Sequence, residues 1–201
     1  MSRSRVLPIK QPDEDSCGPA ALKTALSILG KRSSVTSLTR LCGTNKNGTT
    51  TKNMIRAIKK LQLPALVTER TTLNHLLSAL KSTPAQKRAV IVSYLYALDG
   101  KNNPKPDSGH WAVVSSYRPS TSRIVLFDSY AGQKTSYQWT EFRKRWIDQT
   151  VKRRKSGRRG GTFKLVRKDE RQLMIVVSTN IADLPKFQMA TARIIAASKV
   201  N

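Results

Sequence analysis

Cysteine is scarce in this sequence of 201 residues, because only Cys17 and Cys42 are present. Two cysteines are too few for a disulfide scaffold, and too few for a zinc site built mainly on thiolates. A disulfide between them is disfavoured in a cytoplasmic protein, and we interpret Cys42 as a buried core thiol. Cys17 is then available for thiol chemistry, and we expect no metal and no other cofactor.

Acidic residues are also scarce, since 12 Asp and Glu stand against 37 Lys and Arg and leave a formal net charge of +25. A field this positive is consistent with an acidic partner, which can be nucleic acid, an anionic membrane surface or an acidic protein substrate, and equally with a cytoplasm whose proteins are generally basic. Charge alone does not choose among these. Residues 143–171 hold thirteen basic and three acidic residues and predict an exposed loop or hairpin.

The candidates for binding a polyanion or nonspecific nucleic acid within that stretch are Lys152, Arg153, Arg154, Lys155, Arg158 and Arg159. Charge runs are more often solvated surface. No zinc-finger spacing, basic leucine zipper or aromatic RNA-binding motif accompanies this run.

Long apolar runs are missing as well. No stretch of about 18 uninterrupted apolar residues occurs, and residues 1–11 contain arginines but no apolar run. We therefore expect a soluble, cytoplasmic protein without a transmembrane segment. The length and the 38% hydrophobic content fit one domain. We predict it over residues 1–180, followed by a tail at 181–201 with a short surface helix.

Apolar spacing predicts helices in the first half of the chain and strands in the second. Asp15 and Ser16 offer N-cap side chains to a helix that Gly30 ends. Further helices are expected at residues 51–61, 73–80 and 139–147, and β-branched or aromatic runs predict strands at 65–68, 89–95, 111–117, 124–127, 162–166 and 173–178. The predicted class is α+β, with a helical lobe packed on an antiparallel sheet.

Cys17 lies where the first helix is expected to begin. The unpaired N–H groups and aligned dipoles at a helix start stabilise a thiolate. Gly18 lets another chain approach the backbone closely, and Pro19 loses no hydrogen bond in a first turn. The alternative is that Cys17 is a small core residue beside an N-cap.

Two more residues complete a candidate constellation. His110 stands at the beginning of a predicted strand, whereas the only other histidine, His75, falls within a predicted helix. Asp128 ends the next strand and can face the far nitrogen of His110, or it simply caps the turn through Gly132. A strand-edge histidine is more often merely hydrogen-bonded than catalytic.

Gln11 precedes Cys17 by six residues, and its side-chain N–H can join the backbone N–H of Cys17 in stabilising an oxyanion. A lone glutamine is ordinarily a solvated surface residue. Taken together, the order and spacing of these residues favour a Cys-His-Asp arrangement with an oxyanion-hole glutamine.

The stretch QPDEDSCGPAAL, residues 11–22, resembles the nucleophile motif of the C39 and C39-like peptidases, which belong to the papain-like cysteine peptidase superfamily. GHWAVV at 109–114 and IVLFD at 124–128 are similar to the family's histidine and aspartate strands. The likeness spans roughly residues 6–180.

The resemblance implies a cysteine peptidase that acts on a peptide or protein. Cys17 would attack the carbonyl, His110 would exchange the proton, Asp128 would orient His110 and Gln11 would bind the oxyanion. The best-known members of the family are domains of ABC transporters that cut leader peptides after a double glycine. This sequence has no membrane segment and no ATPase motif, so that substrate is not carried over. An inactive relative that binds polyanions is the alternative.

Overall fold

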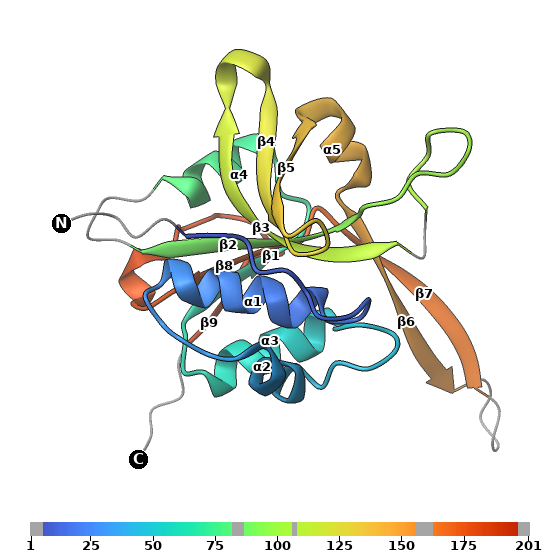
Figure 1. Cartoon of the computed structure of the whole chain (residues 1–201), viewed down its shortest axis with the longest axis horizontal. Coiled ribbons are helices and arrows are strands. Elements are labelled where there is room, and N and C mark those ends of the chain that lie inside the picture. The colour runs from blue at the N-terminus through green and yellow to red at the C-terminus, as the bar shows by residue number, and fades with distance from the viewer. Residues whose placement is uncertain (1–5, 82–86, 106–107, 156–162, 197–201) are drawn as a thin grey trace.

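One twisted antiparallel sheet organises the molecule (Figure 1). The computed structural model describes residues 6–81, 87–105, 108–155 and 163–196, with the backbone alone for 149–168. The helices are α1 (Cys17–Ile28), α2 (Val35–Cys42), α3 (Thr51–Lys60), α4 (Leu73–Leu80) and α5 (Trp139–Arg145). The strands are β1 (Ala65–Thr68), β2 (Arg88–Leu95), β3 (Gly109–Arg118), β4 (Arg123–Asp128), β5 (Gln133–Gln138), β6 (Ile147–Lys155), β7 (Phe163–Arg171), β8 (Met174–Ser178) and β9 (Arg193–Ile195).

The main sheet has seven strands in the order β5-β4-β3-β2-β8-β1-β9, and every neighbouring pair is antiparallel. Figure 1 shows α1, α2 and α3 below this sheet and α4 and α5 above it. The sheet is therefore covered on both faces, which explains why its central strands read as continuous apolar runs.

Alternation along β2 divides the core between these two faces. Ala89 and Ile91 belong to the cluster between the sheet and α1, α2 and α3, whereas Val90, Val92 and Tyr94 belong to the cluster between the sheet and α4 and α5. Successive side chains of a strand point to opposite faces, so one run of sequence supplies both cores.

Helix α1 is the most buried of the helices on its side of the sheet, with Ala20, Leu22 and Ala25 fully buried. It ends at Leu29 and Gly30, whose φ of +74° glycine adopts without strain. The predicted side-chain N-cap is wrong in detail, because Ser16 occupies the cap position but its hydroxyl donates to Asp13 Oδ1 at 2.6 Å instead.

Three elements depart from the predictions. Helix α2 lies in a segment for which the sequence pattern predicts no element, and there Ser34 accepts a cap bond from Ser37 N–H. Strand β5 is polar and lacks an apolar run, so it follows from pairing with β4 rather than from its own composition. The predicted surface helix of the tail is wrong, since Arg193–Ile195 forms β9 and pairs with β1.

Strands β6 and β7 form a separate two-stranded hairpin, in agreement with the predicted hairpin in the basic stretch. Its base is joined to the body by buried polar contacts. The Thr51 hydroxyl donates to Glu170, and the Ser93 hydroxyl donates to Asp148. Within the described ranges, no helix has the length and apolar character needed to cross a bilayer.

Candidate active site

Cys17 is the first residue of α1, and its side chain lies at the junction of the helical layer with the sheet. The residue is 5% exposed, so it is neither sealed completely nor open on a flat surface. It lies close enough to His110 to act on the pKa of the imidazole. The structure thus brings the thiol and the imidazole together from positions 93 residues apart in sequence.

His110 lies near the start of β3 and uses its other side to contact Asp128 at the end of β4. The distance between His110 Nε2 and Asp128 Oδ1 is 3.1 Å, and both side chains are buried. His75, by contrast, lies in α4, where Nδ1 accepts from the Thr72 backbone N–H in a capping box. His110 is therefore the histidine that meets both a thiol and a carboxylate.

The surroundings of His110 favour its protonated form. Burial alone would lower the pKa of the imidazole, but hydrogen bonds with Asp128 and Cys17 and their charges outweigh it and raise the pKa to about 9. A histidine with this pKa carries its proton at neutral pH.

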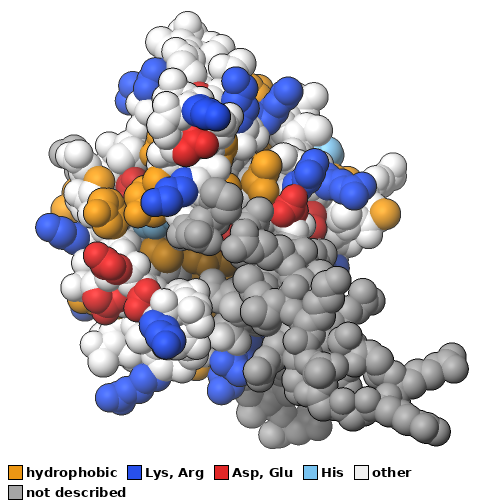
Figure 2. All heavy atoms as spheres, turned by 90° about the vertical axis from the view of Figure 1, so that its right-hand side faces the viewer, with side chains coloured by type: hydrophobic (Ala, Val, Ile, Leu, Met, Phe, Trp, Pro, Cys, Tyr) orange, Lys and Arg blue, Asp and Glu red, His pale blue; other side chains and the backbone are white. Residues whose placement is uncertain are grey.

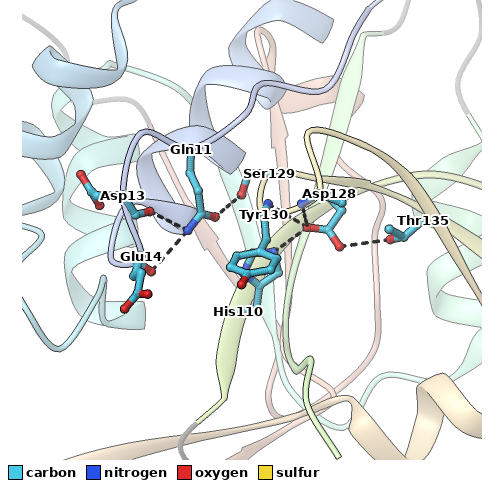
Figure 3. A network of polar contacts seen from close by, with 9 residues as sticks. Gln11, Asp13, Glu14, His110, Asp128, Ser129, Tyr130 and Thr135 are labelled. Carbon is cyan, nitrogen blue, oxygen red and sulfur yellow. Dashed lines mark hydrogen bonds and ion pairs between the residues drawn. The ribbon is translucent and has the colours of Figure 1, made fainter.

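Asp128 is held by several donors besides His110. Its Oδ1 accepts the backbone N–H groups of Tyr130 at 2.9 Å and Ala131 at 3.4 Å, and Oδ2 accepts the Thr135 hydroxyl at 3.3 Å (Figure 3). Burial raises the pKa of Asp128, but the His110 contact and these N–H groups lower it further than burial raises it. Asp128 therefore both caps the turn and faces His110, so the two roles considered from sequence coexist.

Gln11 is buried rather than solvated, at 8% exposure. Its amide nitrogen donates to the carbonyl oxygens of Asp13 at 2.7 Å and Glu14 at 3.3 Å, and its Oε1 accepts the Ser129 hydroxyl at 2.9 Å (Figure 3). The Gln11 backbone N–H also donates to Ser129 O. These bonds tie the loop before Cys17 to the turn after Asp128.

Aromatic side chains that sequence reasoning missed surround His110. The rings of Tyr94 and Tyr96 approach it edge-on, with centroids 5.6 and 5.7 Å away. Both tyrosines lie on the strand or strand extension paired with the histidine segment. Their spacing of two residues places them on one face of a strand, which was the signal available in the sequence.

Cys42 is fully buried, so the prediction of a core thiol is confirmed. Both cysteines are free and do not form a disulfide with each other. Burial raises the pKa of the Cys42 thiol to about 12, although the charge of Arg56 opposes this rise. Cys42 is thus chemically inert beside Cys17.

The candidate polyanion-binding residues lie apart from this constellation in the chain. Lys152, Arg153, Arg154 and Lys155 belong to β6, whereas Arg158 and Arg159 lie outside the described residues. Their role in binding stays a prediction.

Comparison with known proteins places this geometry in a family. Residues 4–152 match the family described as Peptidase_C39 like family. No curated protein sequence is significantly similar to the chain.

Two solved structures resemble the molecule. The peptidase domain of Streptococcus ComA, a bi-functional ABC transporter involved in a quorum sensing pathway, aligns with a TM-score of 0.61 at 20% identity, over 88% of this chain and 100% of that one. A double glycine motif protease from an AMS/PCAT transporter, in complex with the leader peptide, aligns with a TM-score of 0.55 at 14% identity, over 89% of this chain and 96% of that one. These likenesses confirm the predicted α+β, papain-like fold.

Proposed function

Since the chain belongs to the peptidase C39-like family and is a cysteine peptidase, we propose that it hydrolyses peptide bonds with Cys17 as nucleophile, His110 as proton carrier and Asp128 as the residue that orients His110. The observation that carries this proposal is the position of one buried imidazole between a thiol at a helix start and a carboxylate.

Acylation begins from a thiolate and an imidazolium. Asp128 accepts from Nε2 of His110, so Nδ1 is the nitrogen that remains for the thiol. The positive end of α1 and the charged imidazole both stabilise the thiolate. The sulfur attacks the scissile carbonyl carbon, and His110 then gives its proton to the departing amine, which leaves a thioester on Cys17.

Deacylation reverses the proton movement. The neutral His110 takes a proton from water, the hydroxide attacks the thioester carbonyl, and the carboxylic acid product leaves as the thiolate and imidazolium return. An acceptor amine in place of water would make the same site a transferase, and hydrolysis is the reaction that we propose.

The oxyanion of both tetrahedral intermediates needs donors, and the backbone N–H of Cys17 is one of them because a first-turn N–H has no helical partner. Gln11 is the second donor in this proposal. Its amide nitrogen now donates to Asp13 and Glu14, so substrate must exchange at least one of these bonds for a bond to the oxyanion. The Ser129 bond to Gln11 Oε1 keeps the amide facing the correct way during that exchange.

The proposed substrate is a peptide or an exposed protein segment. This agrees with the related transporter protease that was determined with a leader peptide bound. Two free thiols, one of them required for the reaction, also fit a reducing compartment, and we propose a cytoplasmic location.

The experiment is digestion of a proteome-derived peptide library by the wild type, Cys17→Ala and His110→Ala, with cleavage products read by mass spectrometry. Cys17→Ala should cleave nothing, and His110→Ala should lose roughly 10²- to 10⁴-fold in rate, the usual contribution of a positioned acid-base group. His75→Ala is the matched control, since His75 caps α4, and it should cleave as the wild type does.

Iodoacetamide titration of the native protein gives an independent readout, because Cys42 is fully buried. Cys17 should react faster in the wild type than in His110→Ala. Equal alkylation rates, or cleavage by Cys17→Ala, would count decisively against the mechanism.

A further inference from the structure

Two exposed tyrosines adjoin the catalytic constellation. Tyr96 is 41% exposed and Tyr130 is 57% exposed, and their rings contact each other at 5.5 Å between centroids. Tyr96 also packs its ring against the edge of His110. Aromatic surface left open to solvent next to a reactive group is typical of a binding subsite.

Exposed large apolar side chains are otherwise few. Among the described residues the others are Leu7, Ile181 and Ile194. The face in Figure 2 shows apolar side chains, in orange, gathered in a hollowed region with a histidine in pale blue among them and a group of acidic side chains below.

Hydrogen bonds to both of its main-chain polar groups fix the backbone of Tyr96. Its backbone N–H donates to Ser108 O at 3.0 Å, and its carbonyl accepts from Arg145 Nη1 at 2.6 Å. Arg145 is itself buried and bonded to Glu141 at 2.6 Å. The buried guanidinium of Arg145 thus donates to the Tyr96 carbonyl and to Glu141. The charge-assisted bond to the carbonyl fixes the backbone that carries the exposed ring.

Tyr130 is held by the carboxylate that orients His110. Its backbone N–H donates to Asp128 Oδ1 at 2.9 Å, and the preceding residue, Ser129, bonds to Gln11. The backbone of Tyr130 is therefore attached to the carboxylate that contacts His110, and its ring lies against the ring of Tyr96.

The chemistry of the reaction decides which part of the substrate meets these rings. His110 protonates the departing amine, so the substrate residue that carries this amine lies on the His110 side of the scissile bond. Tyr96 packs its ring against His110 itself, with centroids 5.7 Å apart. The residue that follows the scissile bond is then the one that can cover the tyrosine pair.

We propose that Tyr96 and Tyr130 form the subsite for the residue that follows the scissile bond, and that they select an apolar or aromatic side chain there. This inference rests on the proposed peptidase function. A basic side chain is the other partner that aromatic faces attract, and the cleavage profile distinguishes the two.

The test is the residue profile after the cleaved bond in the same peptide-library digestion, with Tyr96→Ala, Tyr130→Ala, Tyr96→Phe and Tyr130→Phe. The wild type should favour Leu, Met, Phe, Tyr and Trp over Gly and Asp by roughly tenfold or more in kcat/KM, as pockets for apolar groups do. The alanine variants should flatten this preference, and the phenylalanine variants, which keep the rings, should retain it.

The matched control is Ile194→Ala, which removes another exposed apolar side chain, on β9 at the edge of the sheet, and should leave the profile as in the wild type. A library cleaved with no preference after the bond, a preference for Lys or Arg there, or a preference that persists in both alanine variants overturns the subsite while the peptidase stands. No cleavage by the wild type overturns both.

Discussion

His110 is the residue on which the chemistry converges. Asp128 contacts its Nε2, Cys17 lies close enough to act on its pKa, and the rings of Tyr94 and Tyr96 pack against it. The two polar partners raise its pKa to about 9 despite burial, so the imidazolium is the resting form at neutral pH. In the proposed mechanism this proton is the one that His110 gives to the departing amine.

The raised pKa of His110 predicts the alkaline limb of the pH profile. Folding favours the protonated imidazole, so the proton is present at neutral pH and is lost as the pH rises through about 9. Single-turnover cleavage of a library-derived peptide should therefore decline across that pH. Asp128→Asn removes the charge that favours the imidazolium, and it should move the limb downward toward 6.5 and lower kcat/KM by roughly 10²- to 10⁴-fold.

Asp183→Asn, in the short 3-10 turn after β8, is the control for that experiment and should keep the wild-type profile. An alkaline limb that stays in place in Asp128→Asn would show that Asp128 does not tune His110.

At the scale of elements, one loop sets the separation of the thiol and the imidazole. Thr49, between α2 and α3, lies against Gly18 so closely that a Cβ on that glycine would stand 2.5 Å from Thr49 Oγ1 and 2.6 Å from its Cβ. The Thr49 carbonyl accepts the buried Trp111 Nε1–H at 2.7 Å. The loop is thus clamped between the first turn of α1 and the strand that carries His110.

Gly18→Ala should therefore destabilise the protein by roughly 1–3 kcal/mol, the usual cost of overpacking, in urea unfolding. In a protein that already carries Thr49→Gly, the further change Gly18→Ala should lower the free energy of unfolding much less. Thr49→Gly removes the clashing side-chain atoms and keeps the carbonyl that accepts from Trp111.

Gly100→Ala is the matched control, since a Cβ there meets nothing within 4 Å, and its effect should stay within about 0.5 kcal/mol. A Gly18→Ala protein as stable as the wild type would contradict the clamp.

At the scale of the whole molecule, charge is distributed unevenly. Three of the 12 acidic residues, at positions 13–15, lie within four residues of Cys17. The basic stretch instead forms the β6–β7 hairpin, which is joined to the helical layer through Glu170 and to the sheet through Asp148. If the hairpin itself binds polyanions, removing its basic residues should weaken binding more than removing basic residues elsewhere on the surface. If net charge alone attracts polyanions, the two changes should weaken binding equally.

Binding of a single-stranded oligodeoxynucleotide to the Cys17→Ala protein, measured against salt, separates them. Replacing Lys152, Arg153, Arg154 and Lys155 by Ala should weaken binding and reduce the salt slope by about 0.7 for each phosphate that is no longer neutralised. The charge-matched control replaces four exposed lysines, which are Lys31 in the loop between α1 and α2 and Lys52, Lys59 and Lys60 on α3. Equally weakened binding in both variants would show that net charge alone attracts the polyanion.

The elements predicted well are those whose signal is local. Apolar periodicity with a glycine stop predicts α1, and β-branched runs predict β2, β3, β4 and β8. Helix α2 was missed although Val35, Leu38 and Cys42 recur at helical spacing within a polar segment. Strand β5 was missed because its sequence is polar, and the tail was misread because three residues of strand carry little pattern of their own. Tertiary pairing decided those segments.

The candidate site divides in the same way. The sequence by itself determined that a cysteine would begin a helix, that a histidine would open a strand and that an aspartate would end one, because each depends on neighbours within a few residues. Only the tertiary structure decided that Gln11 would bond to Ser129 and that Tyr96 would meet Tyr130 beside His110. The Tyr96–Tyr130 and Gln11–Ser129 contacts join residues 34 and 118 positions apart, and their geometry follows from how the layers pack, which no local pattern encodes.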